Sequence, residues 1–305
     1  MMKRLLLTTA ALAGLAHATT ANAEDIAVLT PYLSSVATNE MVETFTKESQ
    51  AKGWTVNVVD TRGDFQQLAS RVEDVTNAGA DAIVLVSVDP NQIGDQVAAA
   101  AGKNIPVFVL DGALADGVTA NITTDNFALG TILSDYLFEA LGGEGKIVKF
   151  FHSAHPGVRQ RELALDEALK KDPDFEVIAE HYVQVPGPID NARQAMETFI
   201  RQYGEKIDGV WAAWDEPAVG ALLAIQSDMP DADIVIAGID GNPQAIDLIE
   251  QCTNLAATVR QDFPGIASAA VGEIETVLGG GEPSSREIFV EAKVIDRETL
   301  GSNCE

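Results

Sequence analysis

Short, nearly continuous apolar runs alternate with longer amphipathic stretches in the first part of the chain. The apolar runs begin at residues 26, 55, 82 and 105, and helical patterns lie between them near residues 41–50, 65–79 and 93–104. Some helical patterns end at a glycine, such as Gly53 and Gly79, which suits a left-handed helix cap. Continuous apolar strands that alternate with helices are typical of a parallel sheet covered on both faces.

The same pattern begins again in the second part of the chain. Four more apolar runs begin at Lys146, Phe175, Gly209 and Asp233, again with helical stretches between them. The sequence therefore predicts an α/β protein with two similar, doubly wound parallel-sheet lobes. No Pro/Ser-rich linker separates the lobes, so we expect short crossovers. A late helix from Pro264 and a final strand from Arg286 are left over, and either lobe could take them.

The first residues have the layout of a cleavable secretory signal. Lys3 and Arg4 precede an apolar run from Leu5 to about Leu15, and a string of small residues ends at Ala23. The run is too short to span a bilayer as a helix. No cysteine follows it as an acceptor for a lipid anchor. We therefore expect residues 1–23 to be a signal peptide and the mature protein to diffuse freely in the periplasm.

The net charge and the two cysteines limit the partners and the covalent bonds that we expect. The chain has 46 acidic and 20 basic residues, for a net charge of −26. Because phosphate binding needs a basic surface, we expect no nucleic-acid partner. We interpret the acidity as a solubility property, with repulsion of anionic ligands as the alternative. Cys252 and Cys304 are an even pair in an oxidising compartment, so we predict a disulfide that ties down the C-terminal tail.

Polar residues follow several of the predicted strands at the point where each strand ends. They are Ser87, Asp89, Asp111, Trp214, Asp215, Asp240 and Gln261. In open α/β sheets, ligands bind outside the carboxyl ends of the strands, so these side chains are expected to converge on one cleft. Each of them alone could instead form a turn or cap a helix. Their recurrence in both lobes favours a binding site.

Several strings together resemble the ribose-binding-protein-like group of type I periplasmic binding proteins, which are the sugar-binding components of ABC importers. They are VFVLDG, ITTDNFALG, GVRQRELALDEAL, WAAWDEPAVGALLAIQ, IVIAGIDGNPQAIDLI and LAATVRQDFPGIASAAV, in the family's order. The resemblance implies two lobes joined by three crossovers. The first lobe would hold residues 24–124 and 262–290, and the second residues 125–261 and 291–305. Hinges would lie near residues 124–126, 261–262 and 290–291.

The resemblance also implies a ligand site. Asp111, Arg161, Asp240 and Gln261 match family positions that hydrogen-bond the sugar, and Thr124 matches a contact at a crossover. We add Ser87 and Trp214 as ligand-binding candidates. Carboxylates would accept hydroxyl protons, while guanidinium and amide groups would donate to hydroxyl oxygens. For Asp125 we favour a hinge or helix-cap role, and for Arg159 a structural or interlobe role.

The chain departs from the family pattern at three places. Gly112 stands where an arginine is common, and Trp214 stands where an asparagine is common. The loop after the first strand, which commonly carries a pair of aromatic residues, offers only Tyr32, with Ala37 and Thr38 further on. Trp214 could stack on a ligand or belong to the core. We expect Trp211 to be a core residue.

Two other classes of protein were weighed against this interpretation. An enzyme would need a nucleophile with a base, or a metal site, and the chain has neither HExxH nor GxSxG. We interpret His152 and His155 as cleft-lining or loop residues rather than metal ligands. A lac-type repressor shares the fold but begins with a basic helix-turn-helix. This chain instead begins with a signal-like segment and is strongly acidic, so we do not expect a repressor.

We therefore predict the periplasmic solute-binding component of an ABC importer, which closes around a small sugar or polyol. It would be a monomer that needs no cofactor and delivers its ligand to a membrane permease. The alternatives are a sensing role beside a chemoreceptor and binding of a sugar acid.

Overall fold

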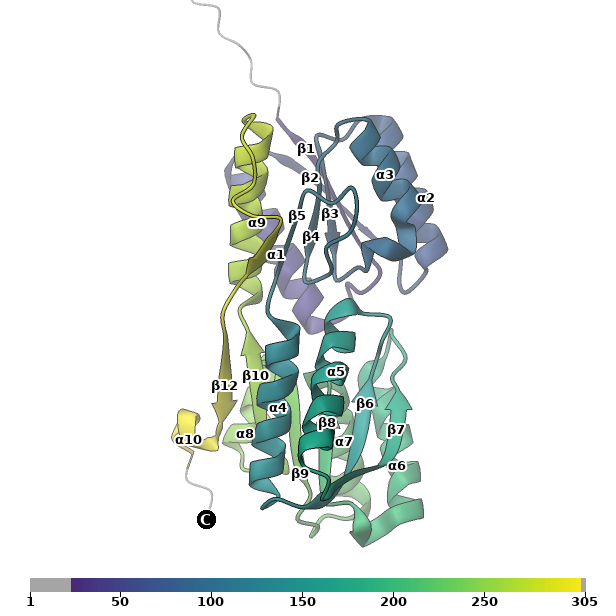
Figure 1. Cartoon of the computed structure of the whole chain (residues 1–305), viewed down its shortest axis with the longest axis vertical. Coiled ribbons are helices and arrows are strands. Elements are labelled where there is room, and N and C mark those ends of the chain that lie inside the picture. The colour runs from purple at the N-terminus through teal and green to yellow at the C-terminus, as the bar shows by residue number, and fades with distance from the viewer. Residues whose placement is uncertain (1–22, 303–305) are drawn as a thin grey trace, which may run out of the picture.

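The computed structural model describes residues 23–302 and has two lobes stacked along its long axis (Figure 1). Each lobe contains a six-stranded sheet, so the predicted fold class is confirmed. Residues 1–22 of the proposed signal peptide lie outside the described residues. Cys304, one partner of the predicted disulfide, lies outside them as well. Among the residues described, no helix combines the length and apolarity needed to cross a bilayer.

The N-terminal lobe is built on a sheet with the strand order β11-β5-β4-β3-β1-β2. Its strands are β1 Asp25–Thr30, β2 Thr55–Asp60, β3 Ala82–Val86, β4 Val107–Leu110, β5 Ala120–Thr123 and β11 Glu287–Phe289. Its helices are α1 Val36–Ala51, α2 Phe65–Ala78, α3 Gly94–Gly102 and α9 Phe263–Leu278, with a short 3-10 helix η1 at Pro90–Ile93. All pairings in this sheet are parallel.

The C-terminal lobe repeats this plan with the strand order β12-β10-β9-β8-β6-β7. Its strands are β6 Gly145–Phe151, β7 Phe175–Tyr182, β8 Gly209–Ala212, β9 Val235–Asp240, β10 Leu255–Gln261 and β12 Ala292–Asp296. Its helices are α4 Asn126–Ala140, α5 Pro156–Lys171, α6 Pro188–Tyr203, α7 Asp215–Asp228, α8 Pro243–Glu250 and α10 Arg297–Leu300, with a short 3-10 helix η2 at Gly204–Lys206. Only β12 runs antiparallel to its neighbour, β10.

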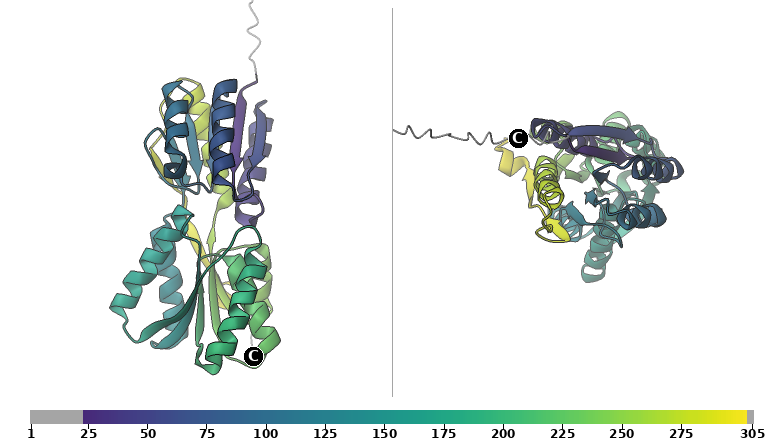
Figure 2. Two further views of the ribbon diagram at one scale, coloured as in Figure 1. Left: turned by 90° about the vertical axis from the view of Figure 1, so that its right-hand side faces the viewer. Right: turned by 90° about the horizontal axis from the view of Figure 1, so that it is seen from above.

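Helices cover both faces of each sheet because the strands are apolar on both sides. In β1, Ile26 and Val28 pack in one core with α1 and α9. The alternate residues Ala27 and Leu29 pack in a second core with α2 and α3. In the C-terminal lobe, α4 and α5 lie on one side of the sheet and α6 and α7 on the other (Figure 2). This burial on both faces explains the continuous apolar runs in the sequence.

The chain passes from one sheet to the other three times. It leaves the N-terminal sheet after β5, returns after β10, and crosses again between β11 and β12. The single final strand expected from Arg286 is wrong, since two short strands in different sheets replace it. Strand β5 was not among the expected strands either. All three crossings lie at one edge of each sheet. The chain passes to the other lobe from the carboxyl ends of β5 and β10, so the carboxyl ends of the two sheets face each other.

Candidate functional site

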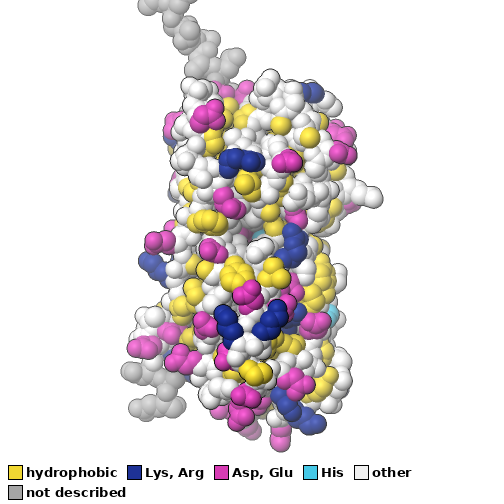
Figure 3. Space-filling model, in the orientation of Figure 1, with side chains coloured by type: hydrophobic (Ala, Val, Ile, Leu, Met, Phe, Trp, Pro, Cys, Tyr) yellow, Lys and Arg dark blue, Asp and Glu magenta, His cyan; other side chains and the backbone are white. Residues whose placement is uncertain are grey.

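A pocket of about 520 Å³, part of it open to solvent, lies where the carboxyl ends of the two sheets meet. Both lobes line it, with Tyr32, Ser35, Ala37, Thr38, Ser87 and Asp111 from the N-terminal lobe and His152, His155, Val158, Arg161, Val185, Pro188, Trp214 and Asp240 from the C-terminal lobe. Around the cleft, the face shown in Figure 3 mixes acidic and basic side chains and has no continuous basic patch.

The two lobes contact each other directly across this cleft. Asp89, which follows β3, forms an ion pair with Arg159 of α5. Tyr32, which follows β1, places its hydroxyl 3.1 Å from Nε2 of His152. These contacts join the two lobes across the cleft, and we call this arrangement the closed form.

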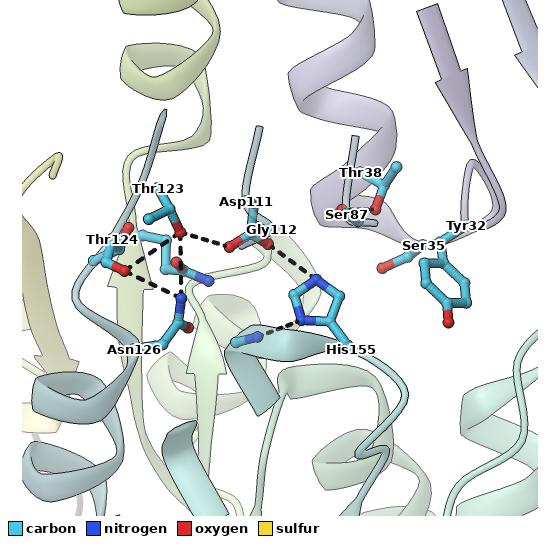
Figure 4. A network of polar contacts seen from close by, with 12 residues as sticks. Tyr32, Ser35, Thr38, Ser87, Asp111, Gly112, Thr123, Thr124, Asn126 and His155 are labelled. Carbon is cyan, nitrogen blue, oxygen red and sulfur yellow. Dashed lines mark hydrogen bonds and ion pairs between the residues drawn. The ribbon is translucent and has the colours of Figure 1, made fainter. Parts of the chain in front are cut away.

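Asp111 is held at the end of β4 by its backbone and by two neighbours. It adopts a positive φ of 48°, and its amide N–H donates to the Ile122 carbonyl. Its carboxylate accepts a hydrogen bond from Thr123 Oγ1 at 3.4 Å (Figure 4). A Cβ atom on the next residue, Gly112, would stand 2.4 Å from the Val88 carbonyl oxygen. With the backbone in this position, no side chain fits at residue 112.

His155 reaches Asp111 from the opposite lobe. Its Nε2 lies 3.5 Å from Oδ2 of Asp111, and its Nδ1 accepts a hydrogen bond from the Gly157 amide at the start of α5 (Figure 4). Burial lowers the pKa of His155 to about 4, although Asp111 opposes this shift. The ring is therefore neutral at pH 7. With Nδ1 as the acceptor, the proton is on Nε2, which faces the Asp111 carboxylate.

Arg161 is fixed in α5 by three partners. Its Nε donates to Oδ1 of Asn126 at 2.8 Å, and one terminal nitrogen donates to the Ala213 carbonyl at 2.6 Å. The same nitrogen lies 3.7 Å from the Asp240 carboxylate. A Cβ on Gly130 would come within 2.6 Å of the Arg161 backbone, so α4 and α5 pack closely beside this side chain. The guanidinium is thus pre-positioned at the pocket wall.

Asp240 ends β9 with a positive φ of 126°. Its Oδ1 accepts a hydrogen bond from Gln261 Nε2 at 2.9 Å. Burial raises the pKa of Asp240 well above its ordinary value, while Arg161 acts in the opposite direction. Within the described residues, Oε1 of Gln261 is buried without a hydrogen-bond partner. A ligand hydroxyl would relieve the desolvation at Asp240 by donating to it.

Asp215 has a structural role behind Asp240. Its carboxylate accepts hydrogen bonds from the Asn242 amide and from Thr258 Oγ1, both at 2.7 Å. Burial raises the pKa of Asp215 to about 7. These bonds fix the loop that follows Asp240, and Asp215 is not among the lining residues.

The remaining polar positions come from the ends of β3 and β8. Ser87 has a positive φ of 58°, and its hydroxyl is 2.9 Å from Thr38 Oγ1, so each can serve as donor or acceptor. Trp214 is only 7% exposed and presents its remaining surface to the pocket. Together with Asp111, Arg161 and Asp240, these groups can accept from and donate to the hydroxyls of a small ligand.

A family model described as a periplasmic binding protein domain matches residues 26–282. The chain belongs to this family. It is 28% identical over 300 residues to the ribose import binding protein of Haemophilus influenzae, covering 97% of this chain and 99% of that one. It is also 28% identical over 247 residues to the xylitol-binding protein of Mycolicibacterium smegmatis, covering 80% and 70% of the two chains.

Solved structures of periplasmic binding proteins share the fold. An ABC transporter solute binding protein from Agrobacterium vitis, solved with bound allitol, superimposes with a TM-score of 0.85. It is 23% identical, and the match covers 92% of this chain and 97% of that chain. This likeness supports the two-lobed fold.

The structure brings together most of the residues expected in a periplasmic binding protein site. Ser87, Asp111, Arg161, Trp214 and Asp240 all line the pocket. Thr124 and Gln261 are buried but are not lining residues. Ligand contact by any of the seven stays a prediction.

The roles expected for Asp125, Arg159 and Trp211 agree with the structure. The Asp125 side chain caps α4 by accepting from the Ala128 amide. Arg159 lies at the lobe interface through Asp89. Trp211 is fully buried, and its indole N–H donates to Ser134 Oγ.

Two histidines and a tyrosine line the pocket although they were not among the ligand-binding candidates; for His152 and His155 a cleft-lining position was one of two expectations. Tyr32, His152 and His155 all line the pocket, and the HSAHP string places a histidine directly before the proline that starts α5. A histidine next to a helix start is a weak signal, because it caps the helix in the same way wherever it occurs. No cluster of three or more His, Cys, Asp or Glu side chains that could hold a metal ion occurs within residues 23–302.

Proposed function

We propose that this protein is the solute-binding component of an ABC importer and closes around a small neutral sugar or polyol. The observation that carries the proposal is that Asp111 from one lobe and Asp240 with Arg161 from the other line a single pocket. The ribose and xylitol specificities of the relatives support this class of ligand. The pocket holds charged groups from both lobes, so a bridging ligand favours the closed form.

The charges in the pocket favour a neutral ligand over a sugar acid. A ligand carboxylate would be repelled by Asp111, and it would add negative charge beside the buried Asp240, whose pKa is already raised. Arg161 is already engaged by Asn126, Ala213 and Asp240. Hydroxyls can donate to the two carboxylates and accept from the arginine at the same time, and such charge-assisted bonds are stronger than neutral ones.

We further propose how the chain is organised for this task. Residues 1–23 direct export to the periplasm, and the lobes comprise residues 24–124 with 262–290 and residues 125–261 with 291–305. Closure occurs by bending at residues 124–126, 261–262 and 290–291. The closed form then presents both lobes to a membrane permease. The binding chemistry, rather than catalysis, is the activity of the protein.

A thermal-shift screen tests the proposed function. Pentoses, hexoses, alditols and sugar acids are added separately, and a ligand that binds the folded state raises its melting temperature by mass action. We expect at least one neutral sugar or alditol to raise it, and Asp240→Ala to remove the effect. As a matched control, Asp228→Ala changes an exposed aspartate at the end of α7 and should keep the shift. Stabilisation by sugar acids alone, or an unchanged shift in Asp240→Ala, would overturn the proposal.

A further inference from the structure

The order of the strands in the two sheets determines which pocket residues lie near the crossovers and which lie far from them. The crossovers lie beside β5 and β10, and the next strands are β4 and β9, which end at Asp111 and Asp240. Strands β1, β6 and β7 lie toward the opposite edges of the sheets, and the loops that follow them supply Tyr32, His152 and Val185. Figure 4 shows Tyr32 on one side of His155, with Thr124 and Asn126 on the other. The pocket therefore has an inner end beside the crossovers and an outer end.

The inner end holds the charged groups. Asp111, Arg161 and Asp240 all lie there, each 5% exposed or less. His155 Nε2 lies 3.5 Å from Asp111, and the hydrogen-bond partners of the two carboxylates, Thr123 and Gln261, leave lone pairs that ligand hydroxyls can use. A ligand carbon without a hydroxyl at this end would leave lone pairs of a buried carboxylate unsatisfied.

Two polar side chains at the outer end, Tyr32 and His152, have no hydrogen to offer a ligand. The hydroxyl of Ser35, which also lines the pocket, lies 3.5 Å from Oε2 of Glu216. His152 Nδ1 lies 2.8 Å from the Val183 carbonyl, which can only accept, so Nδ1 is the protonated nitrogen. Burial lowers the pKa of His152, so the ring is neutral and Nε2 is an acceptor. The Tyr32 hydroxyl therefore donates to Nε2 and has no proton left for a ligand.

Three apolar or aromatic side chains complete the outer end. Val185 and Pro188 follow β7, and Trp214 follows β8. The Val185 carbonyl lies close to Gly63, beyond β2, which places this loop at the edge of the lobes opposite the crossovers. A terminal hydroxyl placed against these side chains would lose its hydration and gain few partners, whereas a methyl group would gain from burial.

From this polarity we propose that the ligand is a sugar or polyol that lacks a hydroxyl at one end. Its hydroxylated part lies between Asp111, Arg161 and Asp240, and a methyl or other short apolar terminus lies against Val185, Pro188 and Trp214. This inference rests on the proposed function and deepens it by naming the ligand class.

Calorimetric titration of matched sugars tests the inference. The pairs are D-ribose, D-allose and L-mannose, each with its terminal-deoxy analogue, and internal-deoxy analogues serve as a second comparison. We expect the terminal-deoxy sugar of the pair that binds to bind at least fivefold tighter than its parent, and the internal-deoxy sugar at least tenfold more weakly. Weaker binding of every terminal-deoxy sugar than of its parent would overturn the inference and leave the proposed function standing. Failure of every neutral sugar and alditol in the thermal screen would instead overturn the proposed function.

A nearly isosteric substitution sharpens the same test. Val185→Thr puts a hydroxyl into the outer end with little change in shape, so the preference for the terminal-deoxy sugar should fall at least threefold. Val58→Thr makes the same change on β2 outside the pocket, where Val58 is 40% exposed, and should leave the preference unchanged. An equal preference in Val185→Thr and in the unsubstituted protein would contradict the assignment of the outer end.

Discussion

His155 couples proton binding to closure at the scale of a single residue. In the closed form its pKa is about 4, chiefly through burial, against an ordinary value of 6.5. When the lobes part, the ring meets water and its pKa returns toward the ordinary value. Between these values the open form binds more protons than the closed form, so the closed form loses stability as the pH falls from 6.5 toward 4.

This coupling predicts a difference in pH dependence between the unsubstituted protein and His155→Asn. Asparagine is a good helix cap and does not titrate, so it keeps the start of α5 while removing the proton linkage. Relative to this variant, the unsubstituted protein should lose roughly tenfold in ligand affinity between pH 7 and about pH 5. Titration calorimetry at several pH values measures the ligand affinity of each protein, and the ratio of the two affinities gives the effect of His155. Parallel pH profiles for the two proteins would contradict the role given to His155.

Residues at strand ends were easier to predict than residues that reach across the cleft. Asp111 and Asp240 follow apolar runs directly, so periodicity together with sheet geometry was enough to place them at the cleft. Gln261 also ends a strand, but it turns toward Asp240 rather than lining the pocket. The contacts of Tyr32 and His155 depend on how the two lobes meet, and no local pattern encodes that.

At the scale of elements, α1 depends on the opposite lobe for its cap. The Ser35 side chain makes no capping hydrogen bond. Instead Glu216, at the start of α7 in the C-terminal lobe, accepts from the Val36 amide at 3.2 Å. The negative charge also suits the positive end of the helix. The contact exists only while the lobes are closed.

Removing this cap is expected to weaken ligand binding without unfolding the protein. Glu216→Ala should cost the closed form about 1 kcal/mol, which corresponds to roughly fivefold weaker binding. Glu167→Ala, at an exposed position on α5, is the matched control and should bind as before. Calorimetry gives both affinities. Equal affinity in Glu216→Ala and in the control would show that the cap does not contribute to closure.

The close packing of α4 on α5 gives a second prediction at this scale. In Gly130→Ala the new methyl would stand 2.6 Å from the Arg161 Cα and carbonyl oxygen, so the helices must move apart. We expect a loss of about 1–3 kcal/mol in the free energy of unfolding and weaker ligand binding. Gly272→Ala on α9 meets no atom within 4 Å and should instead stabilise by about 0.5–1 kcal/mol. Urea denaturation separates the outcomes, and equal stability of the two variants would refute the packing argument.

Strands that lie within apolar runs were predictable, including the four-residue strands β4 and β8. The expected strands at Ile26, Ala82 and Lys146 correspond to β1, β3 and β6. Strands β5 and β11 have only four and three residues, and the polar residues of β5 interrupt its apolar character. The run from Arg286 looked like one strand because a crossing between sheets changes the pairing partner without changing the apolar character of the residues.

At the scale of the whole molecule, the position of the crossovers determines where the cleft can open. Three crossings at one edge leave the opposite edge free to open, and the interlobe contacts of Asp89 with Arg159 and of Tyr32 with His152 bring it together. Composition and the secretory layout could be read from the sequence alone. The polarity of the pocket from inner to outer end could not, because it depends on strand order in both sheets.

A crystal structure of the complex with the neutral sugar or alditol that gives the largest thermal shift tests the central claim most directly. The account predicts one ligand molecule between the closed lobes, with its hydroxyls within hydrogen-bond distance of Asp111, Arg161 and Asp240. A ligand bound outside this cleft, or bound by one lobe alone, would contradict it.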